Sequence, residues 1–309
     1  MKLLIDYLKS FLIYDFKLLP YLVSILILTA LFYYSYEHNL YITIIRTQSI
    51  YLKSFYILSL FSLPYLLVLF LKLKGNIRAF YNINTFIFLS IIFIFLLINA
   101  LTKGHIYLFT SYIANRKEYI EWLFIINISL HKFIILSLPA LIYYLIFTDK
   151  NVFGFKVKDV NLKIYFYMLL IMLIPIIIAS YSNSFLDVYP RYKPGILENS
   201  GIMTKFQTIA AVESFYGLRF IGVELFFRGL MIIGAIRIIG KHAVLPSAVL
   251  YSIWHFGKPM GEAIGAFFGA YILGVLAYKT KSIAGGVILH LGIALLMELF
   301  AYLQLFDIL

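Results

Sequence analysis

The chain has 309 residues, of which 63% are hydrophobic and 13% charged, and its mean hydropathy is +0.94. Soluble domains contain roughly 45 to 50% apolar and about 25% charged residues, so this composition excludes an ordinary soluble protein. A membrane span needs about 20 mostly apolar residues. The sequence therefore predicts an all-α, polytopic transmembrane helical bundle of about eight spans, and its continuous apolar runs exclude a membrane barrel.

The formal net charge of +12 comes from Lys and Arg residues that are spread through short loops. Because no dense basic domain is present, nucleic acid is not an expected partner. The loops that contain Lys72, Lys74 and Arg78, or the lysines at 150, 156, 158 and 163, are predicted to face the cytoplasm and contact anionic headgroups. The absence of cysteine excludes thiol catalysis, disulfides and thiolate metal sites.

Ionisable residues interrupt the first 15 positions, which argues against a cleavable signal peptide. Apolar side chains recur there at helical spacing and predict a short N-terminal helix in the membrane interface: Leu4, Leu8, Phe11 and Leu12. Five nearly uncharged apolar runs follow, and each predicts a span: Leu18 to Tyr34, Phe55 to Leu71, Phe86 to Leu101, Phe133 to Phe147 and Ile164 to Ser180. Four of these runs contain a proline, which membrane helices tolerate.

A polar segment over residues 181–204 contains several turn-forming residues and divides the chain into unlike parts. We predict N-terminal transmembrane helices of unknown role over residues 1–180, a polar connecting loop over residues 181–204, and a functional core over residues 205–309. No internal repeat of fixed period is visible.

Ionisable side chains occur inside the apolar runs of this core: Glu213, Arg219, Glu224, Arg228, His255, Glu262, His290 and Glu298. A charge at the centre of a membrane helix costs roughly 2.5 to 3.5 kcal/mol on insertion scales. Such residues therefore face the interior of a bundle and mark a functional site, or else neutralise one another as a structural pair.

The spacing of these residues places them on shared helix faces. Glu224 and Arg228 are four residues apart and can pair, and Tyr251 and His255 have the same spacing on the next helix. His290 and Glu298 share a face two turns apart, or about 12 Å. A carboxylate and a histidine that meet at one water can act as a general base, and a second polar helix can stabilise an oxyanion. We predict that Glu224, Arg228, His255 and His290 converge on one interior site.

At these residues the sequence resembles the CAAX protease and bacteriocin-processing (CPBP) family of intramembrane endopeptidases. The family pattern is Glu-Glu-x-x-x-Arg, then Phe-x-x-x-His, then His-x-x-x-Asn. The corresponding residues in this chain are Val223, Glu224 and Arg228, then Tyr251 and His255, then His290 and Ala294. The resemblance covers about Phe206 to Phe306.

The resemblance implies an endopeptidase with a Glu/His-activated water. Glu224 and His255 are then expected to deprotonate the water, Arg228 to orient the acid, and His290 to stabilise the oxyanion. Val223 and Ala294 replace the first family Glu and the last family Asn, so Glu262 or Glu298 is expected to supply a substitute carboxylate.

No cofactor is expected from these motifs. Zinc ranks second because Glu224, His255 and His290 match a zinc site in residue type and number, although the sequence contains no His-Glu-x-x-His motif. The expected partners are membrane lipids and a peptide or lipidated protein substrate. We expect a multi-pass protein of the bacterial cytoplasmic membrane, whereas oligomeric state is left open.

Two alternatives remain open from the sequence. The first is a family member that has lost proteolysis and acts as a membrane peptide-binding or immunity protein, as the two replaced polar residues would allow. The second is a proton-coupled transporter that uses Glu213, Glu224, Glu262 and Glu298 as a relay.

Overall fold

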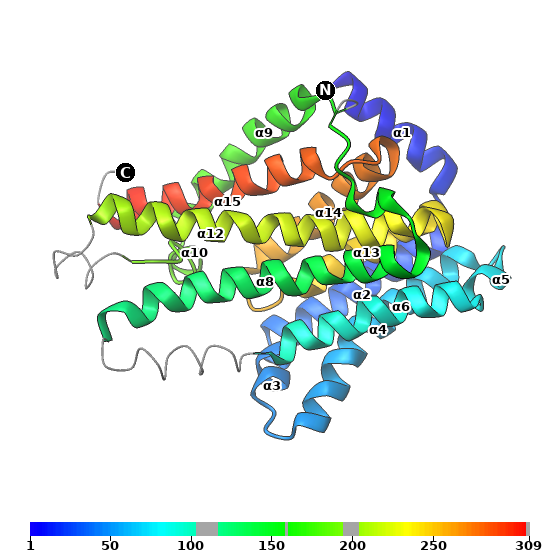
Figure 1. The fold of residues 1–309 in the computed structure, drawn as a ribbon, viewed down its shortest axis with the longest axis horizontal. Helices are drawn as coiled ribbons and strands as arrows, with labels where there is room; N and C mark the ends of the chain where they lie inside the picture. The colour runs from blue at the N-terminus through cyan, green and yellow to red at the C-terminus, as the bar shows by residue number, and fades with distance from the viewer. Residues whose placement is uncertain (103–116, 158–159, 194–203, 307–309) are drawn as a thin grey trace. The chain divides into compact units, whose positions relative to one another are not determined.

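The computed structural model describes residues 1–102, 117–157, 160–193 and 204–306 (Figure 1). Within these ranges the regular structure is helical, apart from one isolated β-bridge between Phe155 and Ser282. Seven described segments are long and apolar enough to cross a membrane: α2 (Leu18–Tyr36), α4 (Ile50–Leu73), α6 (Ile83–Leu101), Trp122–Phe147 of α8 (Lys117–Phe147), α9 (Leu162–Ser180), α14 (Met260–Thr280) and α15 (Ala284–Leu305). The prediction of an all-α polytopic bundle is confirmed.

The chain forms two compact units that alternate along the sequence. Unit 1 comprises Met1–Leu101, Leu138–Val160 and Leu225–Ala284, and unit 2 comprises Thr102–Ser137, Asn161–Glu224 and Gly285–Leu309. The chain passes between them inside α8 and at the end of α12 (Lys205–Glu224). The predicted functional division at residues 181–204 stays a prediction, and residues 194–203 lie outside the described part.

Unit 1 is built around α13 (Val244–Trp254), whose residues from Val244 to Ile253 are all buried. This helix packs against α14 and α4, and the Ser252 hydroxyl donates to the backbone oxygen of Ala263 at 2.8 Å. With 11 residues α13 is about 16 Å long, too short to cross a bilayer by itself. Unit 1 also contains these short helices: α1 (Lys2–Asp15), α3 (Leu40–Arg46), α5 (Ile77–Phe80), η1 (Lys150–Phe153), η3 (Gly234–Arg237) and η4 (Gly240–Ala243).

The apolar run from Phe206 to Gly240 is not one uniform helix. It begins as α12 and changes at Leu225 to a π-helical segment, η2 (Leu225–Ile233), whose side chains are all buried. The sequence gives no sign of this change, because the residues remain apolar throughout. Neither α12 nor α13 is among the seven candidate spans.

In unit 2, α12 packs closely on α8, and the chain also contributes α9, α10 (Asn183–Leu186) and α15. A side chain at Gly222 would meet the backbone oxygen of Phe133 at 2.9 Å, so the glycine allows the two helices to approach. The indole of Trp122 donates to the backbone oxygen of Thr208 at 3.2 Å. These contacts hold α12 along the apolar part of α8.

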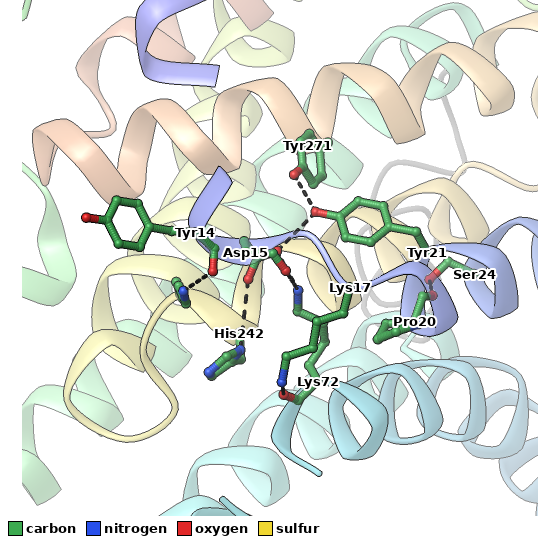
Figure 2. Close-up of polar contacts among 10 residues, drawn as sticks. Tyr14, Asp15, Lys17, Pro20, Tyr21, Ser24, Lys72, His242 and Tyr271 are labelled. Carbon is green, nitrogen blue, oxygen red and sulfur yellow. Dashed lines mark hydrogen bonds and ion pairs between the residues drawn. The ribbon is translucent and has the colours of Figure 1, made fainter. Parts of the chain in front are cut away.

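A polar cluster in unit 1 joins α1, α2 and α4 (Figure 2). The ammonium group of Lys72 lies 2.5 Å from Asp15 Oδ2, and both side chains are completely buried. The Tyr21 hydroxyl donates to the same carboxylate oxygen at 3.0 Å and contacts the Tyr271 hydroxyl at 2.6 Å. The prediction that Lys72 contacts headgroups from a loop is therefore wrong: Lys72 lies in the last turn of α4, where Asp15 neutralises it.

We expect Asp15→Asn to destabilise the protein strongly, because it leaves the buried ammonium group of Lys72 without a counter-charge. Breaking a buried ion pair costs roughly 3 to 5 kcal/mol. Thermal unfolding of the detergent-purified protein measures the effect. Asp6→Asn in the same helix is the control, since Asp6 is exposed. The double variant Asp15→Asn/Lys72→Met should recover part of the lost stability. Equal stability of Asp15→Asn and Asp6→Asn would contradict the role of the ion pair.

Candidate active site

Glu224 and His290 form a hydrogen-bonded pair within unit 2. Glu224 is the last residue of α12 and is fully buried, and His290 lies in the second turn of α15. His290 Nδ1 lies 3.1 Å from Glu224 Oε1. Because an ionised carboxylate can only accept, this geometry assigns the proton of the hydrogen bond to Nδ1. The structure thus brings together the acid of the first motif and the histidine of the third.

Gly286 makes room for this pair. It precedes His290 by four residues, so both positions share one face of α15. A Cβ atom at position 286 would collide with the carboxylate of Glu224. Only a residue without a side chain therefore allows α15 to approach the carboxylate at this point. Sequence analysis missed Gly286, although its spacing from His290 was a visible signal.

An aromatic side chain of α12 packs against His290 of this pair. The Phe220 ring centroid lies 4.5 Å from that of His290. Phe220 also packs with Tyr216 and Ala294 in one buried apolar cluster. Ala294, at the position of the family Asn, is therefore part of the core, and Val223, at the position of the first family Glu, is 1% exposed.

A second group of predicted site residues lies in unit 1, around the ring of Tyr251. The guanidinium carbon of Arg228 lies 4.7 Å from the Tyr251 ring centroid, and Arg228 is buried. The rings of Tyr251 and His255 are 4.5 Å apart, and Trp254 and Phe227 pack against the same tyrosine. Arg228 of the first motif and His255 of the second motif therefore both lie against the ring of Tyr251.

His255 has a defined hydrogen bond at the end of α13. Its Nδ1 lies 2.8 Å from the backbone oxygen of Tyr251. A carbonyl oxygen only accepts, so Nδ1 donates the proton, and in the neutral ring Nε2 is then the basic nitrogen. This hydrogen bond fixes the tautomer of the neutral His255 ring.

The π-helical segment η2 begins directly after Glu224 and contains Arg228. Pi-helical turns are rare and occur frequently at functional sites. Each hydrogen bond in a π-helix spans one more residue than in an α-helix, so the backbone winding changes directly after Glu224 and before Arg228. The predicted pairing of Arg228 with Glu224 stays a prediction, as does the convergence of the four residues on one site.

The two possible substitute acids occupy separate structural positions. Glu262 lies in the first turn of α14 and forms an ion pair with Lys258 four residues earlier. Glu298 is 2% exposed, and its Oε2 accepts the backbone N–H of Arg191 at 2.8 Å. Each of these carboxylates has a contact that explains its position structurally, and a catalytic role for either one stays a prediction.

The remaining ionisable residues of the predicted set lie on α12. The guanidinium group of Arg219 lies over the ring of Tyr216 at 4.5 Å and near that of Phe220 at 5.3 Å. Glu213 is half-buried one turn from Tyr216. Among the described residues, no group of three or more His, Asp or Glu side chains is arranged to hold a metal ion.

The residues Glu224, Arg228, His255 and His290 lie in a segment that matches a known family. Residues 208–296 match the family model described as Type II CAAX prenyl endopeptidase Rce1-like. The match confirms the predicted resemblance. No curated protein and no solved structure matches the chain. At the level of the family, the match supports an intramembrane protease of the CAAX type, and the seven apolar helices support an integral, multi-pass membrane protein.

The contact at Gly286 can be tested directly. We expect Gly286→Ala to displace the Glu224 carboxylate and to cost about 1 to 3 kcal/mol, as overpacking usually does. The control is Gly269→Ala in α14, where a Cβ meets nothing within 4 Å. Thermal unfolding gives the cost, and the ¹⁵N shifts of His290 report the lost hydrogen bond. An unchanged His290 signal in Gly286→Ala would refute the tight contact.

Proposed function

We propose that the chain is an intramembrane endopeptidase that hydrolyses a membrane-associated peptide with a Glu/His-activated water. The observation that carries this proposal is the hydrogen bond between the buried Glu224 and His290, inside the segment that matches the CAAX endopeptidase family. A buried carboxylate and a histidine held in contact are the groups that acid–base hydrolysis needs.

In this proposal Glu224 accepts a proton from water while the oxygen of that water bonds to the peptide carbonyl carbon. The carbonyl π electrons move to the oxygen and give a tetrahedral oxyanion. In the doubly protonated form of His290, Nδ1–H donates to Glu224, and Nε2–H remains to donate to the oxyanion. Collapse of the intermediate breaks the C–N bond, and the leaving amine takes the proton that Glu224 holds.

His255 and Arg228 are assigned supporting roles from their motif positions. His255 is fixed with Nδ1–H on a backbone carbonyl, so Nε2 is the nitrogen that assists proton transfer from water. Arg228 orients the acid, and its guanidinium group is itself positioned over the Tyr251 ring. The substrate class proposed is a peptide or a lipidated protein segment at the membrane.

A second candidate is supported by one specific observation. Ala294 lies in a closed apolar cluster with Tyr216 and Phe220, and Val223 is buried, so both replaced family positions are part of the core. A protein that binds a membrane peptide without cleaving it would need neither polar group. Turnover separates this candidate from the endopeptidase.

Glu224→Gln should lower peptide cleavage at least about a hundredfold, since general-base catalysis usually contributes this much. The assay uses the full-length protein in liposomes with a panel of fluorogenic peptides, some carrying a lipidated cysteine. Glu37→Gln, at an exposed position, is the matched control. If Glu224→Gln keeps full cleavage activity and Glu262→Gln loses it, the role of general base belongs to Glu262. Binding of panel peptides without cleavage by the unmodified protein would favour the non-catalytic candidate.

Chelation tests the expectation that no metal takes part. We expect the cleavage rate to be unchanged in EDTA, because the proposed steps use only protein groups and water. Loss of activity that zinc restores would contradict this expectation and would assign Glu224, His255 and His290 as ligands.

A further inference from the structure

One end of unit 1 is defined by contacts among five segments. The ammonium group of Lys17, just before α2, donates to the backbone oxygen of Lys72 in the last turn of α4, at 3.5 Å. The Lys241 ammonium group of η4 donates to the backbone oxygen of Tyr14. The end of α14 joins this group, because Phe11 packs on Tyr278 with ring centroids 5.6 Å apart.

The loop after α8 lies at the same end, since Ile283 donates its backbone N–H to Gly154 at 3.0 Å. We call this the basic end and define it by its segments: residues 1–17, 72–82, 149–157, 237–243 and 279–283.

The opposite end of unit 1 is defined in the same way. The Tyr36 hydroxyl, at the end of α2, donates to the backbone oxygen of Lys258 at 2.8 Å. Phe32 packs on Phe256 with ring centroids 5.4 Å apart. This opposite end comprises residues 37–53 and 255–262. In Figure 1, α5 and α3 lie at different ends of the α4 and α6 helices.

The two ends differ strongly in charge. The basic end contains these cationic residues: Lys2, Lys9, Lys17, Lys72, Lys74, Arg78, Lys150, Lys156, Arg237, Lys241, Lys279 and Lys281. Its acidic residues are Asp6, Asp15 and Asp149. The opposite end contains Arg46, Lys53 and Lys258 with Glu37 and Glu262. The excess of positive charge is therefore confined to one end of the unit.

The polar cluster of Asp15, Lys72 and Tyr21 lies at the basic end (Figure 2). Two further lysine ammonium groups lie next to it and are not neutralised within the described part of the chain. Lys72 neutralises Asp15 completely inside the protein. Lys17 and Lys241 have no acidic partner among the described residues, and each donates to one backbone carbonyl. A lysine ammonium group has three N–H donors, so each lysine retains two for a phosphate oxygen.

His242 is a further polar residue of this cluster, but its imidazole ring does not add a full positive charge. Its Nδ1 lies 3.9 Å from Asp15 Oδ1. Burial lowers the pKa of His242, and the neighbouring ammonium groups of Lys72, Lys241 and Lys17 act in the same direction, against the opposing effect of Asp15. The positive charge offered to a ligand thus comes from the two lysines.

The surroundings of the two lysines are those of a membrane interface. Tyr14 is 77% exposed, Phe16 54% and Leu18 65%. The Tyr14 ring lies 5.4 Å from the Lys241 ammonium group, and Phe16 and Leu18 flank Lys17 in the sequence. Tyrosine at the end of a span and lysine just outside it are typical of headgroup depth. A soluble acidic partner would leave these apolar side chains in water, whereas a lipid covers both kinds of surface.

We propose that the basic end is the cytoplasmic surface of unit 1, and that Lys17 and Lys241 bind the phosphate of anionic lipid headgroups in that leaflet. Cytoplasmic loops carry an excess of Lys and Arg, and anionic lipids are concentrated on the same side. The proposal does not depend on the proteolytic function.

Lipid binding is tested with the full-length protein in nanodiscs of phosphatidylcholine that contain a fluorescent phosphatidylglycerol. Each lysine near the surface contributes about fivefold to the preference for an anionic lipid. We expect Lys17→Gln and Lys241→Gln each to lower the preference by about this factor, and Lys53→Gln at the opposite end to leave it unchanged. Equal effects of all three variants, or displacement of the lipid by millimolar inorganic phosphate, would overturn the headgroup site.

Orientation is tested separately, and the natural absence of cysteine makes this simple. Asn76→Cys at the basic end and Gln48→Cys at the opposite end are both exposed and leave the charge unchanged. In intact cells a membrane-impermeant maleimide should label Gln48→Cys only, and permeabilised cells should show both labelled. Labelling of Asn76→Cys in intact cells would overturn the cytoplasmic assignment.

Discussion

A charged group in an apolar interior must have a partner, because neither hydrocarbon nor packed side chains can replace the water that it loses. This requirement determines where the buried ionisable residues lie. Asp15 pairs with Lys72, Glu224 bonds to His290, and the Glu298 carboxylate accepts a backbone N–H. Each contact joins segments that are distant in sequence, so each also fixes which helices pack together.

The Glu224–His290 contact shows how such a requirement becomes a candidate site. A carboxylate that needed only neutralisation could pair with a long, flexible lysine, as Asp15 does. A histidine side chain is short, so the two helices must approach closely before the groups can bond. Gly286 permits that approach, and Phe220 packs against the imidazole ring. The chain therefore holds an acid–base pair at a fixed separation, which charge compensation alone does not require.

The parts of the fold that depend on apolar pattern were predictable, and those that depend on exact contacts were not. The five N-terminal runs became helices because length and hydropathy suffice for a span, and Pro64, Pro139 and Pro175 lie inside them. Lys72 was misjudged because sequence shows that a lysine is near a helix end but not that an aspartate 57 residues away neutralises it. The motifs predicted Glu224 and His290 at one site, but with Arg228 as the partner of Glu224. The direct hydrogen bond to His290 and the contribution of Gly286 required knowledge of how α15 approaches Glu224.

The change from α- to π-winding at Leu225 could not be anticipated, because it alters no residue type and leaves the run apolar. The change affects the first family motif, because the π-helical segment begins directly after Glu224 and contains Arg228. Regular α-helical winding places position 228 about 40° from position 224 around the helix axis, whereas a segment with i→i+5 hydrogen bonds turns fewer degrees per residue and changes this angle. Arg228 lies within this segment, and its guanidinium group lies over Tyr251, the ring that also contacts His255. Spacing within a motif therefore identifies the residues of a site, whereas the contacts of each residue follow from the local winding of the backbone and the packing around it.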